Sequence, residues 1–291
     1  MDIEEPVVLE YNNIMIYTDL SNRLKQSPND TMVINQIVNY FITDCVRPGI
    51  KVNDRSSIAF SRLNIYLSNC AATKIDIGEI KTLEEKQLYV NDKSKTKTLS
   101  DDIKLFKENV ACNYMEQDKG GLDILSLLYS EINSGNHIKK PKFINGEFDT
   151  TTINYSNHIF LFTDGYLEFS KEGDLDFYFG QKKIESVRIF CKANNVSAED
   201  AIKSNSKFKL RPLKCENNKY VTLYIMETYD RGLNELNGTL KNTGDLSDNN
   251  ILKTVWETWA YESGFKNFVW KQMTKPNNLP NDYIKTVIVK Q

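Results

Sequence analysis

The stretch that decides the fold is Asn13-Ile-Met-Ile-Tyr-Thr-Asp-Leu-Ser-Asn-Arg23. It begins as an apolar, β-branched run and then changes abruptly to a carboxylate at Asp19 and a hydroxyl at Ser21. A buried strand of a parallel sheet has such an apolar run, and open α/β sheets place their binding sites at the carboxyl ends of these strands. The stretch therefore predicts a central parallel strand with functional groups at its end.

A second stretch, His158-Ile-Phe-Leu-Phe-Thr-Asp-Gly-Tyr166, repeats this design. Its apolar run ends in Thr163, Asp164 and Gly165. If both strands lie centrally in one parallel sheet, Asp19 and Asp164 converge at the same edge although they are far apart in sequence. We expect this edge to carry the site.

The rest of the chain alternates between strand and helix patterns. Helical periodicity or capping signals occur at residues 31–44, 101–112, 122–133, 183–194 and 248–263, and strand patterns at 57–67, 221–229 and 284–289. This alternation is typical of a doubly wound, mostly parallel α/β sheet flanked by helices. We expect one domain over residues 1–291, with a polar insertion at about 75–119 and an excursion from the sheet at about 166–182.

Composition narrows the class of protein. Hydrophobic residues make up 40% of the 291 and charged residues 26%, which is ordinary for a soluble globular chain. The net charge of −2 argues against nucleic acid as a direct ligand. The acidic start, Met1-Asp-Ile-Glu-Glu-Pro6, is unlike a secretory signal, and no stretch has the roughly 18 apolar residues needed to span a bilayer. We expect a cytoplasmic protein that does not insert into membranes.

Several kinds of site find little support. The five cysteines are scattered without a Cys-x-x-Cys pair, so we expect free, buried thiols. With only two histidines, a multi-histidine metal centre or a histidine-based triad is poorly supported. No glycine-rich phosphate loop follows the first strand. The abundance of Asn, Lys and Ile is typical of a chain from an AT-rich bacterial genome.

Three short motifs, in their order, resemble those of von Willebrand factor A domains. Asp19-Leu-Ser-Asn-Arg23 is similar to the Asp-x-Ser-x-Ser signature, Gly120-Gly-Leu-Asp-Ile124 to a Gly-Gly-Thr-Asp helix opening, and Phe162-Thr-Asp-Gly165 to a Thr-Asp-Gly strand end. The order of motifs and elements agrees over residues 8 to 265. The resemblance implies a metal-ion-dependent adhesion site, where a divalent cation held by oxygen ligands binds an acidic residue of a partner.

Carried over residue by residue, the resemblance implies that Asp19, Ser21 and Asp164 are cation ligands. Two positions depart from the pattern, because Arg23 stands where the second Ser should be and Leu122 where the Thr should be. A guanidinium is always charged and has no lone pair for a cation, so an inward-pointing arginine opposes metal binding.

Two outcomes follow from these departures. In one, Asp123 replaces a lost hydroxyl, and the site of Asp19, Ser21, Asp123 and Asp164 holds Mg²⁺ or Ca²⁺. In the other, Arg23 pairs with Asp19 or Asp164 and takes over the structural role of the cation. The second outcome leaves a metal-free interaction domain.

The resemblance implies an adaptor rather than an enzyme. Intracellular relatives of this kind bind partner proteins in multiprotein assemblies, often beside ATPases or in bacterial mobile-element and defence operons. We therefore expect a protein partner that contacts Arg23, Asp19 and Asp164.

Two other interpretations stay open. Asp19, Asp123 and Asp164 could serve a Mg²⁺-dependent phosphoesterase or nuclease of PIN-like type, with Glu227 as a candidate fourth acid. The hydroxyl at Ser21 and the acidic net charge argue against this hydrolase. The third interpretation is a structural scaffold with a vestigial site.

Overall fold

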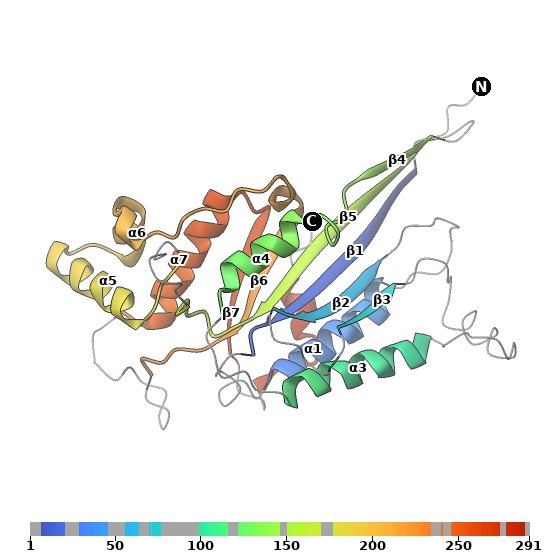
Figure 1. Cartoon of the computed structure of the whole chain (residues 1–291), viewed down its shortest axis with the longest axis horizontal. Coiled ribbons are helices and arrows are strands. Elements are labelled where there is room, and N and C mark those ends of the chain that lie inside the picture. Colours follow the sequence, from blue (N-terminus) through green and yellow to red (C-terminus); the bar gives the residue numbers. More distant parts are fainter. Residues whose placement is uncertain are drawn as a thin grey trace, which may run out of the picture.

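A sheet of seven strands forms the centre of the molecule, and helices cover both of its faces (Figure 1). The computed structural model describes residues 7–20, 29–45, 56–63, 70, 72–76, 99–115, 122–145, 150–169, 177–233, 240, 246–273 and 278–288. The sheet is mostly parallel, which confirms the predicted α/β class.

The strand order places the two predicted central strands next to each other. The strands are β1 (Val7–Thr18), β2 (Ser57–Arg62), β3 (Thr73–Asp76), β4 (Lys142–Asn145), β5 (Thr150–Phe162), β6 (Val221–Thr228) and β7 (Asn267–Gln272). They follow the order β3-β2-β1-β5-β6-β7, and β4 pairs with β5 outside this path. Among these pairs, β2–β3 and β4–β5 are antiparallel.

The register of β1 on β5 aligns their carboxyl ends. Their pairing is parallel and continuous from Val7 beside Thr151 to Thr18 beside Phe162 (Figure 1). The last residues of both strands are mostly apolar and buried on both sides of the sheet, as expected for central parallel strands. The residues that follow Thr18 and Phe162 therefore emerge side by side.

The helices divide between the two faces of the sheet. They are α1 (Asp30–Tyr40), α3 (Leu99–Met115), α4 (Ile124–Asn133), α5 (Gln181–Asn194), α6 (Ala198–Ser204), α7 (Asp248–Ser263) and α8 (Tyr283–Val287). A π-helical turn, Phe41–Cys45, continues α1, and short 3₁₀ turns lie at Ser206–Phe208 and Glu216–Tyr220. In the described part of the chain, no helix combines the length and apolar character that crossing a membrane would require.

Each central strand contributes side chains to two hydrophobic cores, because successive side chains point to opposite faces of the sheet. Ile14 and Ile16 of β1 pack with α1, α3 and α8, whereas Met15 and Tyr17 pack with α4 to α7. The same division is visible in Figure 1, where α1 and α3 lie on one side of the sheet and α4 to α7 on the other.

One predicted strand is a helix. The strand pattern at residues 284–289 folds as α8. Tyr283, Ile284 and Val287 of this helix are buried in the core beside α1. Helical spacing of the buried side chains therefore outweighs the β-branched composition of the segment.

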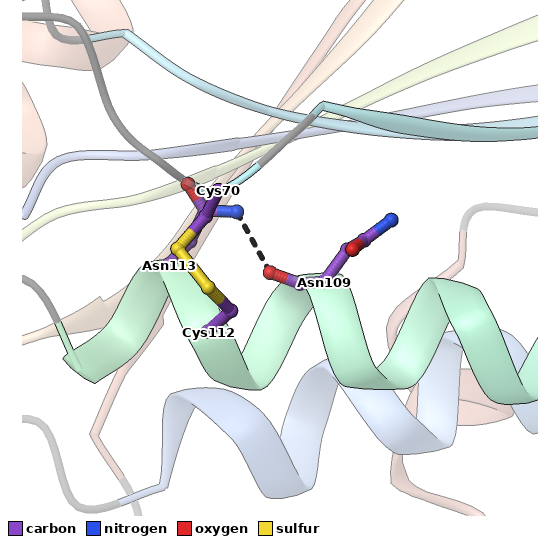
Figure 2. Close-up of a disulfide and its surroundings, with 4 residues drawn as sticks. All are labelled: Cys70, Asn109, Cys112 and Asn113. Carbon is purple, nitrogen blue, oxygen red and sulfur yellow. Dashed lines mark hydrogen bonds between the residues drawn. A yellow bond between two sulfur atoms is a disulfide. The ribbon is translucent and has the colours of Figure 1, made fainter.

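A disulfide corrects the expectation of free thiols. Cys70 and Cys112 are bonded, with their Cα atoms 5.9 Å apart, which is an ordinary separation for a disulfide. Figure 2 shows the bond on α3, next to Asn113, whose Nδ2 donates to the carbonyl of Asn109 at 2.7 Å. Cys45, Cys191 and Cys215 are not joined in a disulfide. Spacing could not reveal the pair, because the fold brings together residues 42 positions apart.

Candidate functional site

The carboxyl ends of β1 and β5 meet through a pair of polar residues. The backbone N–H of Asp19 donates to the carbonyl of Phe162 at 2.9 Å, and the hydroxyl of Thr163 donates to Oδ2 of Asp19 at 3.3 Å. Thr163 in turn donates its backbone N–H to the carbonyl of Met226 of β6 at 3.3 Å. The ends of three neighbouring strands are thus tied together, and the predicted convergence of these strand ends is confirmed.

Asp164 lies at the same edge and is paired with an arginine. Its Oδ2 accepts a hydrogen bond from Nη2 of Arg231 at 2.8 Å, and its Oδ1 accepts the backbone N–H of Tyr166 at 3.1 Å. Asp164 is only 6% exposed, so this charge-assisted bond is largely shielded from water. Both carboxylate oxygens of Asp164, one of the predicted metal ligands, are therefore engaged by protein donors.

Arg231 has further partners around it. Its Nη1 donates to Oε2 of Glu168 at 2.7 Å, and its guanidinium lies 4.0 Å from the ring centre of Tyr166. Burial alone would lower the pKa of Arg231, but the negative charges of Asp164 and Glu168 outweigh burial and raise it. The side chain is still 37% exposed. A permanent positive charge is thus fixed in orientation and open to solvent.

The network continues inward to α7. The hydroxyl of Tyr166 donates to Oδ2 of the fully buried Asp248 at 2.5 Å, and the other carboxylate oxygen of Asp248 pairs with Arg188 of α5. Burial, with the carboxylate of Asp248, raises the pKa of Tyr166, so its hydroxyl remains protonated and can donate. Hydrogen bonds and ion pairs thus run from the sheet edge through Tyr166 to the first turn of α7 and on to Arg188.

Gly165 lets the chain turn sharply between Asp164 and Tyr166. Its φ is +90°, in the left-handed region, and a Cβ there would lie 2.7 Å from Cη2 of Trp270. The carbonyl of Gly165 accepts a hydrogen bond from Nε1 of the buried Trp256 at 2.8 Å. Two tryptophans therefore fix the backbone that positions Asp164.

Replacing Gly165 with alanine should lower the free energy of unfolding by about 2 kcal/mol, from left-handed strain and the clash with Trp270. Gly264 is a matched control, because its φ is +89° but a Cβ added there would meet no atom within 4 Å. Gly264→Ala should therefore cost only the strain, about 1 kcal/mol. Urea denaturation of both variants measures the difference. Equal losses of unfolding free energy in the two variants would show that the ring of Trp270 does not clash with a Cβ at residue 165.

Asp123 occupies a helix cap rather than a ligand position. It precedes α4, and its Oδ1 accepts the backbone N–H of Ser126 at 3.2 Å. Along β1, Asn13 contacts His137 and Tyr17 contacts Glu131, so α4 runs antiparallel to β1 and begins near the carboxyl edge. Asp123 therefore lies toward the predicted edge, with its side chain bound to its own helix.

Leu122, which stands where the resemblance expects a threonine, packs against the hydrophobic core. An apolar contact therefore replaces a ligand at this position. Ser21 and Arg23, with Gly120 and Gly121, lie outside the described residues.

The described side chains alone do not assemble the metal site that the resemblance implies, and Ser21, one of its four members, lies outside them. Within the described ranges, no group of three or more His, Cys, Asp or Glu side chains is placed to hold a metal ion. Asp164 is paired with Arg231, and Asp123 caps α4. The arrangement instead combines a fixed guanidinium with an exposed acidic neighbour, which suits recognition of polar groups.

Sequence reasoning missed Arg231, although a signal was available. Thr228-Tyr-Asp-Arg-Gly232 is a third strand end that changes from apolar to charged, as the ends of β1 and β5 do. Glu227 belongs to this strand end; it is 1% exposed and has a φ of 58°. The register of β6 on β7 shifts between Ile225 and Thr228, which accounts for this backbone as a β-bulge.

The sequence matches no model of a known protein family, and no curated protein matches it either. Function is therefore inferred from the fold and from the contacts at the strand ends. The solvent-exposed charge on Arg231 is the most distinctive feature among them.

Proposed function

We propose that the chain is a non-enzymatic protein-interaction module that binds a partner at its strand-end surface. The exposed groups of this surface are Arg231 and Glu168, and beneath them lie the buried side chains of Asp164, Tyr166 and Asp19. The observation that carries the proposal is the guanidinium of Arg231, which bridges two carboxylates and stays open to solvent.

Charge favours binding over hydrolysis at this surface. A Mg²⁺ site needs a surplus of carboxylate charge, whereas Arg231 balances the charge of Asp164 at 2.8 Å. In the family that the sequence resembles, a cation attracts an acidic residue of the partner. At the corresponding edge of this chain, the ion-paired Arg231 and Glu168 offer a partner a hydrogen-bond donor and an acceptor without any metal.

The side chains also suit an interface. Arginine is among the residue types most often found at the energetic centres of protein interfaces. Arg231 lies over the ring of Tyr166 and is held by Glu168, so little side-chain freedom remains to be lost on binding. By analogy with the resembling family, the partner belongs to a multiprotein assembly, such as one of a bacterial mobile-element or defence system.

A second candidate function is a Mg²⁺-dependent phosphoesterase or nuclease. The placement of carboxylates favours it, because Asp19, Asp123, Asp164 and Glu227 all lie toward the carboxyl edge of the sheet. Such a mechanism would require Asp164 to leave Arg231 before a metal could bind. We rank it second for this reason.

Arg231→Gln tests the proposal, with Arg211→Gln as the matched control. Arg211 also lies over an aromatic ring, that of Phe177, but it belongs to the segment between α6 and β6. Proteins captured from the source cells by the wild type should also be captured by Arg211→Gln, and Arg231→Gln should lose at least one of them. Circular dichroism checks that both variants are folded.

A hydrolysis assay separates the two functions. The wild type should not cleave single-stranded RNA or DNA when Mg²⁺ is supplied. Cleavage that depends on Mg²⁺ and disappears in Asp19→Asn would replace the adaptor proposal with the phosphoesterase. Identical partners for both arginine variants would also contradict the proposal.

A further inference from the structure

A cavity lies beside α4, over the β2–β3 side of the sheet. Its volume is about 210 Å³. At about 30 Å³ for each water molecule, it has room for roughly seven waters, or for a small organic ligand. We call it the β2–β3 hollow. Its wall residues include Met15, Tyr17, Ala59, Lys74 and Glu131.

The strand register explains why this space is open. Met15 of β1 lies beside Ala59 of β2, which lies beside Lys74 of β3, so the three side chains share one face of the sheet. Tyr17 and Ser61 form the next rung on that face. In both rungs the side chain from β1, Met15 or Tyr17, is large, and its neighbour on β2, Ala59 or Ser61, is small. The surface is therefore hollowed between α4 and Lys74.

Polar groups converge on one wall of the hollow. The hydroxyl of Tyr17 donates to Oε2 of Glu131 at 3.2 Å, and Nε2 of His137 lies 3.4 Å from the same oxygen. Burial, reinforced by the negative charge of Glu131, raises the pKa of Tyr17, so the phenol stays protonated. Both contacts engage Oε2, which leaves Oε1 of Glu131 able to accept a further hydrogen bond.

We propose that the β2–β3 hollow binds a small organic cation with one primary ammonium group and a short apolar body. The ammonium would pair with Glu131 beside the ring of Tyr17, since a carboxylate and an aromatic ring are the usual partners of organic cations. The apolar body would lie on Met15 and Ala59.

Calorimetric titration with n-butylammonium tests the proposal on the full chain. The wild type should bind it, and Glu131→Gln should bind at least tenfold more weakly, because glutamine keeps the size and the acceptor for Tyr17 but loses the charge. Glu199→Gln is the matched control, since Glu199 is an exposed acid on α6 that pairs with Lys203. This control should bind as the wild type does.

Two further titrations make the test specific. Butan-1-ol, which has the same length without the charge, should bind at least tenfold more weakly than n-butylammonium. Ala59→Leu, which fills the hollow without changing its charge, should abolish binding. The proposal is overturned if the wild type does not bind the amine, if butan-1-ol binds equally well, or if Glu131→Gln retains the wild-type affinity.

Discussion

Cys112→Ser should lower the free energy of unfolding by about 4 kcal/mol. The disulfide joins residues 42 positions apart, and a closed loop of this length removes about that much chain entropy from the unfolded state. Domains are stable by about 5–15 kcal/mol in total, so the loss would be a large part of the margin. Urea denaturation under non-reducing conditions measures it.

Reduction provides an internal control for this prediction. Dithiothreitol should destabilise the wild type by the same amount and leave Cys112→Ser unchanged. Cys215→Ser, which removes a free and partly exposed thiol, should behave as the wild type under both conditions. A wild type whose urea midpoint does not respond to reductant would contradict the Cys70–Cys112 bond.

The stability of the protein should fall by about 3 kcal/mol as the pH is lowered from about 6.5 to about 4, through His158 alone. His158 is buried in β5, where its ring nitrogens contact the hydroxyl of Tyr224 at 3.0 Å and Oδ1 of Asn12 at 3.1 Å. Burial, with a smaller effect of Lys266, lowers the pKa of His158 to about 4. In this window the unfolded chain binds a proton that the folded chain does not, so acid favours unfolding.

His158→Gln removes the titrating group and keeps a side chain that can form hydrogen bonds. Between pH 6.5 and pH 4, the free energy of unfolding of this variant should fall by about 3 kcal/mol less than that of the wild type. Parallel pH profiles for the wild type and His158→Gln would show that His158 does not govern acid stability.

The central strands could be predicted because a buried strand has an apolar local sequence. The apolar runs of β1, β5 and β6 need no knowledge of their neighbours, since a strand buried on both faces has few polar positions. The end of α7 could also be predicted from local sequence, because Gly264 adopts the left-handed conformation that stops the helix.

Other strands could not be predicted because pairing, not composition, makes them strands. All residues of β4 are exposed, and its pairing with the long β5 defines it. In β7, the apolar run Phe268-Val-Trp270 is only three residues long and has polar residues on either side, and the place of the strand beside β6 comes from the sheet. Long-range hydrogen bonds of this kind leave no clear periodicity in the sequence.

The candidate site was predictable in position but not in chemistry. The strand ends at Asp19 and Asp164 meet at one edge of the sheet, as the sequence predicted, because parallel neighbours end together. The sequence suggested that Arg23 pairs with Asp19 or Asp164; Arg23 lies outside the described residues, and the arginine that the structure places on Asp164 is Arg231. Which charge reaches a given carboxylate depends on loop geometry, and no local pattern encodes it.

Calorimetric titration of the wild-type protein with Mg²⁺ and Ca²⁺ tests the central claim most directly. We expect no saturable binding of either ion at the strand ends, because Arg231 already pairs with Asp164. Saturable binding by the wild type that Asp19→Ala abolishes would contradict this claim and would show that these carboxylates hold a metal.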